Sequence, residues 1–336
     1  MLDAITDIPG IKVGHASDLT GYTGCTVVLF EKGAVCGIDV RGSASGTRQV
    51  DALNLSHIVE QIHAILLSGG SSLGLDAASG VMKYLEEKGV GFDVGVAKIP
   101  IVPTAVIFDL FFGDPHARPT PAMGYEACIN AGEQVEEGSV GVGTGAALGK
   151  LFEVPRSMKG GIGTSSIILP DGLIVGALVV VNAFGDVIDN NTGKIIAGAR
   201  VSGQSLEFAD TAECLKKGYT KKQFGLVNTT LGVVATNAKF NKRDITKIAQ
   251  MAQAGLIKTI VPVHTTFDGD LIIAASAGEV EADINRVGIL SDFVIGEAVK
   301  RAVKKADGFG IIPAFKDINK EWKAEDRTLQ KNETRR

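Results

Sequence analysis

The sequence predicts an α+β or layered α/β protein, with helices packed over large sheets. Short apolar and β-branched runs recur between turn signals, which is typical of buried strands. Three other stretches place apolar residues at helical spacing. The two kinds of segment mix without strict βαβ alternation. These observations favour helices layered on sheets.

The expected strands are short, and turn residues separate them. In chain order they are CTVVLF (25–30), AVCGIDV (34–40), AILLS (64–68), SIILPDGLIVGALVVV (166–181), TTLGVVATN (229–237) and LIIAASAG (271–278). Within 166–181, Pro170-Asp171-Gly172 consists of residue types that favour a turn, so that segment is predicted to be a hairpin. The run AVIFDLFF (105–112) is too short to span a membrane and is also predicted to be a buried strand.

Three helices are expected from apolar periodicity. The first covers 72–88 and ends at Gly89, the second begins at about Asp244, and the third covers 291–304. No low-complexity tract or long linker divides the chain, so 1–336 is interpreted as one catalytic domain. Residues from about 316 to 336 are highly charged and are expected to form a solvated tail.

Composition excludes several classes of protein. The 336 residues are 45% apolar and 21% charged, which excludes wholesale disorder. The net charge of −4 leaves no excess of basic residues to bind phosphates, so no nucleic-acid partner is expected. No apolar run is long enough to predict a membrane span. The four scattered cysteines and the absence of a signal-peptide pattern predict a cytoplasmic protein with reduced thiols.

The segment Gly70-Ser71-Ser72-Leu73-Gly74 matches the G-x-S-x-G pattern of a nucleophile elbow. It follows a predicted strand and opens a predicted helix. One interpretation makes Ser72 the nucleophile of a serine hydrolase, with His116 or His264 as its base. The plainer interpretation is a glycine-rich turn that caps the helix.

Two glycine-rich loops carry lysines. The loop 141–150 ends in Lys150 but does not match a phosphate-binding loop, and its lysine alone would be interpreted as a solvated surface residue. Lys159 opens the second loop, which by itself indicates only a turn ahead of a strand.

Thr229 opens a predicted buried strand. If the chain were cut before it, the new α-amine, with a pKa near 8, could take the Oγ proton at neutral pH. Asp268 and Asp270 precede another strand and could orient this amine and hydroxyl. Asn182 ends a strand, where its amide could donate to an oxyanion. Ordinary strand-end and turn roles are the alternatives.

Several motifs in fixed order resemble the DmpA-type aminopeptidase family, over the chain to about residue 315. They are Pro9-Gly10-Ile11-Lys12-Val13-Gly14-His15, Val40-Arg41-Gly42, Ser68-Gly69-Gly70-Ser71-Ser72-Leu73-Gly74-Leu75-Asp76, Ile107-Phe108-Asp109-Leu110, Gly149-Lys150, Lys159-Gly160-Gly161-Ile162-Gly163, Asn228-Thr229-Thr230 and His264-Thr265-Thr266-Phe267-Asp268-Gly269-Asp270. This family includes L-aminopeptidase/D-esterases, β-peptidyl aminopeptidases and 6-aminohexanoate (nylon) oligomer hydrolases.

The resemblance implies a four-layer αββα fold of the N-terminal-nucleophile hydrolase type. It also implies a chain that cuts itself between Asn228 and Thr229 into an α-chain of 1–228 and a β-chain of 229–336. The implied catalytic residues are the nucleophile, an oxyanion amide, an acidic pair and a lysine, which fall on Thr229, Asn182, Asp268, Asp270 and Lys150. Lys159 is the fallback for the lysine.

The resemblance further implies a small peptide or amide substrate and a homo-oligomer of αβ pairs. The proposed chemistry needs no cofactor or metal. Because the β-peptidyl members use a serine nucleophile, Thr229 and the Asp-Gly-Asp segment look more like the nylon oligomer hydrolases. Three alternatives stay open: an acetyltransferase of the ornithine acetyltransferase type, a Ser72 hydrolase with an uncut chain, and a non-enzymatic uncleaved member.

Overall fold

The computed structural model describes residues 1–220 and 228–318, and its centre is a nine-stranded sheet in the order β10-β11-β14-β16-β2-β4-β7-β3, with β1 paired to β2. The strands are β1 (Ile11–Asp18), β2 (Thr23–Val40), β3 (Gly46–Arg48), β4 (Gln61–Ser68), β7 (Thr104–Val106), β10 (Gly161–Ile168), β11 (Ile174–Asn182), β14 (Thr229–Ala238) and β16 (Leu271–Val280). Short sheets elsewhere are β5 (Phe92–Asp93) with β6 (Lys98–Ile99), β8 (Ala147–Leu148) with β9 (Met158–Lys159), and β12 (Asp186–Ile188) between β13 (Ile195–Ala197) and β15 (Ile260–Val261).

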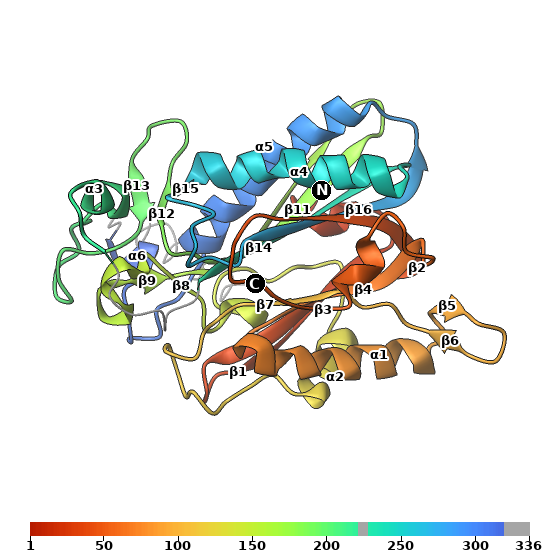
Figure 1. Ribbon diagram of the computed structural model, residues 1–336, viewed down its shortest axis with the longest axis horizontal. Coiled ribbons are helices and arrows are strands. Elements are labelled where there is room, and N and C mark those ends of the chain that lie inside the picture. The colour runs from red at the N-terminus through yellow and green to blue at the C-terminus, as the bar shows by residue number, and fades with distance from the viewer. Residues whose placement is uncertain (221–227, 319–336) are drawn as a thin grey trace, which may run out of the picture.

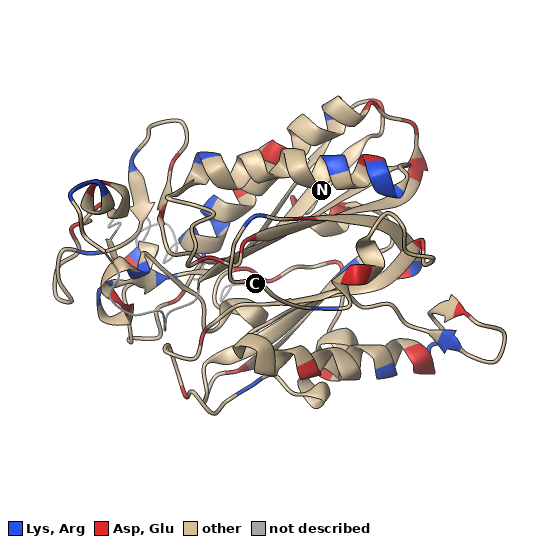
Figure 2. Ribbon diagram, in the orientation of Figure 1, with Lys and Arg blue, Asp and Glu red and all other residues tan. Residues whose placement is uncertain are grey.

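Helices cover both sides of this sheet system. They are α1 (Ala77–Glu87), α2 (Pro121–Ile129), α3 (Thr211–Lys216), α4 (Lys242–Thr259), α5 (Ile284–Lys304) and α6 (Phe315–Ile318). Figure 1 shows α4 and α5 above the strands and α1 and α2 below them. Figure 2 shows acidic and basic residues intermixed along α1, whereas the charged residues of α4 are mostly basic.

The long strand β2 connects the two strand layers. Its residues 25–29 pair with β4 and its residues 35–40 pair with β16. The two runs predicted at 25–30 and 34–40 are therefore one strand. The register with β4 shifts between Leu29 and Ala34, and Gly33 between them has φ +83°, a conformation that favours glycine.

Three apolar cores separate four layers in the order α–β–β–α. One lies between the strand layers and includes Val28, Leu178 and Leu231. A second joins α4 and α5 to β11, β14 and β16, and a third joins α1 and α2 to β1, β2 and β4. Along β14, Leu231 and Val233 face the central core and Val234 faces the helices, as the period of a strand requires.

Most expected elements form, with shifted ends. The hairpin predicted at 166–181 is β10 and β11, whose register pairs Ile168 with Ile174 around the turn. The third helix begins at Ile284 rather than 291, because Asp283 caps it by accepting from the Asn285 and Arg286 amides. Helix α2, which starts at Pro121 after the N-cap Thr120, was missed.

Two expectations were wrong, one about a strand and one about a loop. The run 105–112 forms a strand only to Val106, because the chain then turns around Asp109, whose carboxylate accepts from Gly70 N (2.7 Å) and Thr23 Oγ1 (2.7 Å). The second glycine-rich loop is instead largely strand β10. A Cβ at Gly163 would lie 2.2 Å from Ala298 O, so the glycine lets α5 approach β10 closely.

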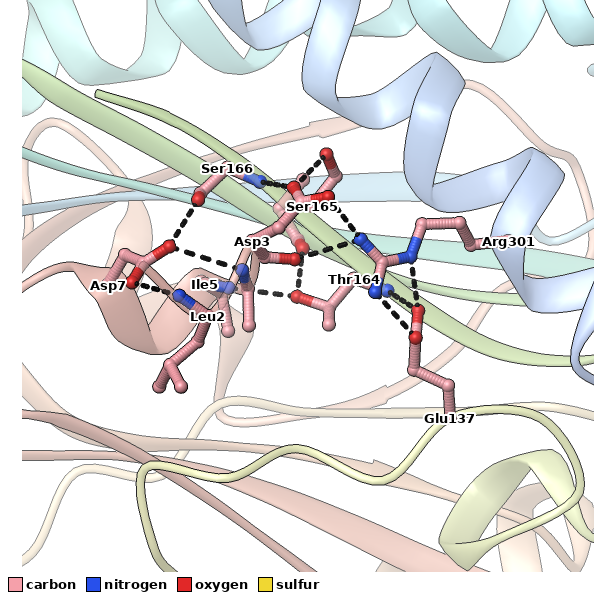
Figure 3. Close-up of polar contacts among 11 residues, drawn as sticks. Leu2, Asp3, Ile5, Asp7, Glu137, Thr164, Ser165, Ser166 and Arg301 are labelled. Atoms are coloured by element: carbon pink, nitrogen blue, oxygen red, sulfur yellow. Dashed lines mark hydrogen bonds and ion pairs between the residues drawn. The ribbon is translucent and has the colours of Figure 1, made fainter. Parts of the chain in front are cut away.

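The N-terminal segment is tied to β10 and α5 by a polar cluster (Figure 3). Arg301 of α5 donates to both carboxylate oxygens of Glu137 (2.8 and 2.6 Å) and to the Asp3 carboxylate (2.7 Å). Asp3 in turn accepts from Ser165 Oγ at 2.9 Å. The predicted tail begins with α6, where Lys316 pairs with Asp307, and residues 319–336 lie outside the described part.

Candidate active site

Thr229 lies at the start of β14, a strand in the middle of the sheet between β11 and β16. The antiparallel register with β11 places Thr229 directly opposite Asn182. Both residues are almost completely buried, with exposed fractions of 2% and 1%. Two residues that lie far apart in the sequence are therefore cross-strand neighbours.

The acidic pair reaches Thr229 because β14 and β16 are parallel, with Leu231 opposite Leu271. The residues that precede the two strands therefore meet at one edge of the sheet. Asp270 Oδ1 accepts from Thr230 N at 2.6 Å, and Asn228 forms a β-bridge with Asp268. A short loop on the far side, from Arg41 to Ala44, donates amide hydrogens to the Asp268 and Asp270 carbonyls.

Both carboxylates of the pair are buried, and each is surrounded by hydrogen-bond donors. Asp268 accepts from Phe184 N (3.0 Å) and from Thr265 Oγ1 (2.5 Å). Burial and the neighbouring Asp270 charge raise the pKa of Asp268 above its ordinary value. The pair is therefore a site where a proton or an ammonium group is held favourably.

Lys150 lies beside Asn182 and is not a surface residue. It opens a 3-10 helix, Lys150–Phe152, its exposed fraction is 3%, and its Nζ donates to Asn182 Oδ1 at 2.8 Å. Ala147 N donates to the same oxygen, which directs the amide nitrogen of Asn182 toward Phe108 O (3.1 Å). The interpretation of Lys150 as a solvated surface lysine was wrong, because the 3-10 helix that it opens buries its side chain against Asn182.

Lys159 is also buried, but it faces a different environment. Its Nζ donates to Gly143 O (2.7 Å) and Gly160 O (2.9 Å) and lies 5.2 Å from the centre of the Phe112 ring. Burial lowers the pKa of Lys159 to about 7. Within residues 1–220 and 228–318, its hydrogen bonds go to these carbonyls and not to Asn182 or Thr229.

The peptide bond between Asn228 and Thr229 lies at the centre of these groups. Thr229 Oγ1 donates to the Asn228 carbonyl oxygen at 2.5 Å. Gly269 N donates to the same oxygen at 2.8 Å. Two donors therefore polarise this one carbonyl, and the hydroxyl of the following residue is already beside it.

His264 is a residue of this site to which the sequence analysis assigned no role beside Thr229. Its ring Nδ1 lies 3.1 Å from Asp270 Oδ2, and its backbone N donates to the same oxygen at 3.0 Å. Its φ of +57° lies in the left-handed region, which few residues other than glycine adopt. The motif His264-Thr265-Thr266 was the available signal, and the geometry indicates that His264 positions Asp270.

A small cavity of about 10 Å³, room for about one water molecule, lies beside Asn182 and Lys150. Its other lining includes Phe108, Asp109, Phe111 and Phe112. Burial raises the pKa of Asp109, which the sequence analysis included in a motif without a role. The cavity is a small space next to the Asn182 amide, lined by both phenylalanines and polar side chains.

Ser72 is exposed on the 3-10 helix Ser71–Asp76 that precedes α1. In the described residues, no hydrogen bond joins its hydroxyl to a histidine, and His264 contacts Asp270 instead. The Gly-rich segment is held by Asp109, which accepts from Gly70 N. This geometry supports the interpretation as a turn.

The part of the chain that the structure describes contains no group of three or more His, Cys, Asp or Glu side chains arranged to hold a metal ion. Among its helices, none combines the length and apolar character needed to cross a membrane. Cys25, Cys36 and Cys128 are buried free thiols, and Cys214 is partly exposed.

A family model described as peptidase family S58 matches residues 3–308. The chain belongs to peptidase family S58. It is 40% identical to an uncharacterized aminopeptidase of Mycobacterium leprae over 94% of this chain and 93% of that protein. It is also 30% identical to a 6-aminohexanoate-oligomer endohydrolase of a Kocuria species, over 89% of this chain and 85% of that protein.

The fold of this S58 member also matches a solved structure. The L-aminopeptidase D-Ala-esterase/amidase of Ochrobactrum anthropi, described as a variant of the Ntn hydrolase fold, superposes with a TM-score of 0.70. The match covers 91% of this chain and 87% of that one at 17% identity. The resemblance and the αββα fold inferred from sequence are confirmed, and the protein is a hydrolase of peptide or amide bonds.

Proposed function

We propose that the protein is a self-processing amidohydrolase or aminopeptidase whose nucleophile is the N-terminal Thr229 of a cut chain. The observation that carries this proposal is the contact of Thr229 Oγ1 with its own preceding carbonyl, together with the Gly269 N–H on the same oxygen. Because the hydroxyl and the polarised carbonyl are adjacent, the precursor holds both partners of an acyl shift.

In self-cleavage, Thr229 Oγ bonds to the Asn228 carbonyl carbon, and the bond from that carbon to Thr229 N breaks. The hydroxyl proton goes to the departing nitrogen, which leaves an ester between the two residues. Water then cleaves the ester, which gives an Asn228 carboxylate and a free Thr229 amine and hydroxyl. The products are chains 1–228 and 229–336.

In turnover, the Thr229 amine takes the Oγ proton as Oγ attacks the substrate carbonyl. The proton then passes to the leaving amine, and water releases the acyl group. Asn182 carries two amide hydrogens, one of which bonds Phe108 O, so the other can donate to the oxyanion. Such a donor contributes roughly 2.7–4 kcal/mol.

The buried acids and Lys150 complete the proposed machinery. Asp268 and Asp270 orient the new amine and favour its ammonium form. Lys150 fixes the Asn182 amide and adds positive charge near the developing oxyanion. For the site lysine we therefore favour Lys150 over Lys159.

The substrates we propose are small peptides, amino-acid amides or ω-amino acid oligomers. The peptidase family and the names of the relatives support this class. We further propose that the cut chains remain as αβ pairs that assemble into a homo-oligomer.

The deciding test is Thr229→Ala, compared with Ser72→Ala. Intact-mass spectrometry and N-terminal sequencing should show wild type and Ser72→Ala as chains of about 24 and 11 kDa, prorated from 35.1 kDa by 228 and 108 residues. The smaller chain should begin at Thr229. Thr229→Ala should remain whole and inactive on amino-acid amides. An active, uncut Thr229→Ala protein would refute the proposal.

A further inference from the structure

Asp109 is a buried carboxylate to which the proposed mechanism gives no role. It follows β7, and Gly70 follows β4, which is parallel to β7 with Ser68 opposite Val106. The residues after the two strands therefore meet at one edge of the sheet. Asp109 is 5% exposed and accepts from Gly70 N at Oδ1 and from Thr23 Oγ1 at Oδ2, both at 2.7 Å. Both carboxylate oxygens are thus held from neighbouring strands.

The glycine-rich turn after β4 makes room for this carboxylate. A Cβ at Gly69 would lie 2.2 Å from Asp109 Oδ2 and 2.4 Å from Thr23 Oγ1. A Cβ at Gly145, which approaches from another loop, would lie 2.7 Å from the same carboxylate oxygen. Gly70 has φ +77°, a conformation that favours glycine. The glycines of a motif that the proposed mechanism leaves out are therefore explained by the approach of one carboxylate.

The backbone next to Asp109 carries the carbonyl that contacts Asn182. Phe108 O belongs to the peptide group that ends at Asp109 N, and this group is planar, so a rotation at Asp109 would move the carbonyl. On the other side of Phe108, Ile107 N donates to Ser68 O at 2.9 Å. Phe108 O accepts from Asn182 Nδ2 at 3.1 Å. The turn that Asp109 holds therefore sets a contact of the Asn182 amide nitrogen.

The other end of the Asn182 amide is held as well. Its Oδ1 accepts from Lys150 Nζ at 2.8 Å and from Ala147 N at 3.1 Å. Because the amide is planar, these contacts and Phe108 O together set the direction of the second Nδ2 hydrogen, the one assigned to the oxyanion. Such a donor acts only when it is aligned, and a misplacement of about 1 Å can cost about 100-fold in rate. A shift of Phe108 O would therefore weaken stabilisation of the transition state.

We propose that Asp109 is a positioning residue for turnover, which fixes the Phe108 carbonyl and thereby aims the second amide hydrogen of Asn182 at the oxyanion. Thr23 and Gly70 contribute by holding the Asp109 carboxylate. Because the oxyanion forms only as the reaction proceeds, loss of this positioning lowers kcat and leaves KM nearly unchanged. The inference rests on the proposed function, because Asp109 acts through Asn182.

The first test compares Thr23→Val with Thr23→Ser in the self-cleaved protein. Both keep the Asp109 carboxylate, and valine has the shape of threonine without the hydroxyl donor. The substrate is whichever of L-alanyl, β-alanyl and 6-aminohexanoyl p-nitroanilide the wild type cleaves fastest. Thr23→Val should lower kcat about 10-fold with KM within about twofold of wild type, and Thr23→Ser should stay within about threefold in kcat. Equal kcat in the two variants, or a change confined to KM, would overturn the inference.

A double-mutant cycle separates positioning from a purely structural role. If Thr23 and Asp109 act through Asn182, Thr23→Val should lower kcat by less than about twofold in the Asn182→Ala background, because the donor that they position is already gone. The same loss of about 10-fold in both backgrounds would show that the contact only supports the fold, and would overturn the inference.

Asp109→Asn tests position against charge. Asparagine has the same shape, and its amide can accept from Gly70 N and donate to Thr23 Oγ1, so the turn is kept while the negative charge is lost. We expect kcat within about threefold of wild type. A loss of about 10-fold or more would show that the charge of Asp109, which lines the same cavity as Lys150, is what acts, and would overturn the inference. This variant decides the question if circular dichroism shows Thr23→Val unfolded or if Asn182→Ala stays uncut.

The two proposals fail in different ways. A cut, Thr229-dependent enzyme in which Thr23→Val and Thr23→Ser have equal kcat would leave the proposed function standing and remove only the role of Asp109. A wild-type chain that stays uncut and hydrolyses none of the three anilides would refute both.

Discussion

At the scale of the residue, two buried lysines lie near the same end of the sheet but contact different groups. Lys150 donates to the Asn182 side chain, whereas Lys159 donates only to main-chain carbonyls in the contacts that the described residues show. A charge acts strongly on a reaction only where it is close to the atoms on which charge develops. The difference in contacts therefore separates their expected roles.

Replacing each lysine with methionine, which has similar length and no charge, tests this difference. Lys150→Met should lower the self-cleavage rate and kcat/KM by about 100-fold, because the Asn182 amide loses the donor that orients it. Lys159→Met should stay within a few-fold of wild type. The rate at which the 11 kDa chain appears measures self-cleavage, and hydrolysis of an amino-acid p-nitroanilide measures kcat/KM. The reverse ranking would assign the site lysine to Lys159.

The buried charge of Lys159 predicts how stability depends on pH. Its pKa is about 7 in the folded protein, against 10.5 for an ordinary lysine, because burial disfavours the charged form. Between these values the unfolded chain binds more protons, so the free energy of unfolding should rise with pH. In Lys159→Met, this contribution to the rise in unfolding free energy should be absent. Urea unfolding at about pH 6.5 and about pH 9, in the uncut Thr229→Ala background, measures the rise in the free energy of unfolding between the two pH values. An equal or larger rise in Lys159→Met than in the protein with Lys159 would contradict the prediction.

At the scale of the element, Arg301 fastens α5 to the N-terminal segment (Figure 3). It donates two hydrogen bonds to Glu137, whose side chain is 10% exposed, and two more to Asp3, one to its carboxylate and one to its backbone carbonyl. Arg286, on the same helix, pairs with Asp171 where both side chains are at least 43% exposed. The two arginines therefore offer a matched comparison of a half-buried cluster with a surface pair.

Arg301→Ala should lower the free energy of unfolding by about 2 kcal/mol, because Glu137 stays buried without its cation. Arg286→Ala should change it by less than about 1 kcal/mol, because water screens the exposed pair. Urea unfolding of both variants in the Thr229→Ala background measures the two effects. Equal changes in the free energy of unfolding in the two variants would show that the Arg301 cluster stabilises α5 no more than the surface pair does.

At the scale of the whole molecule, the proposed cut falls before a strand in the interior of the sheet. β14 pairs with β11 over eight positions and is parallel to β16 on its other side. Its residues also contribute to both the central core and the core under α4 and α5. Cleavage between Asn228 and Thr229 would remove one covalent bond and leave these contacts in place.

The two chains should therefore stay together without denaturant. Size-exclusion chromatography with light scattering should give one particle containing equal amounts of both chains, and only denaturing electrophoresis should separate them. Release of the smaller chain under native conditions would contradict this prediction. The measured mass also tests the proposed homo-oligomer of αβ pairs.

Local patterns in the sequence accounted for much of this architecture. The turn at Pro170–Gly172 and the runs at 229–237 and 271–278 correctly located the hairpin and two central strands. The patterns failed where a single capping or buried residue overrides an apolar run. Asp283 starts α5 earlier than the apolar spacing indicated, and Asp109 ends β7 early.

The site was anticipated in part. Its residues came from motifs in fixed order, and the structure brings Thr229, Asn182, Lys150, Asp268 and Asp270 together; their catalytic roles remain predictions. The contact of His264 with Asp270 was not foreseen, because a turn with positive φ at His264 makes it.

The sequence by itself determined the strand periodicity, the motif order and hence the family, since these depend on neighbours along the chain. Only the tertiary structure decided that Lys150 rather than Lys159 contacts Asn182, and that Gly269 donates to the Asn228 carbonyl. The physical reason is that such contacts depend on strand register. The antiparallel pairing of β11 with β14 and the parallel pairing of β14 with β16 fix which loop ends meet.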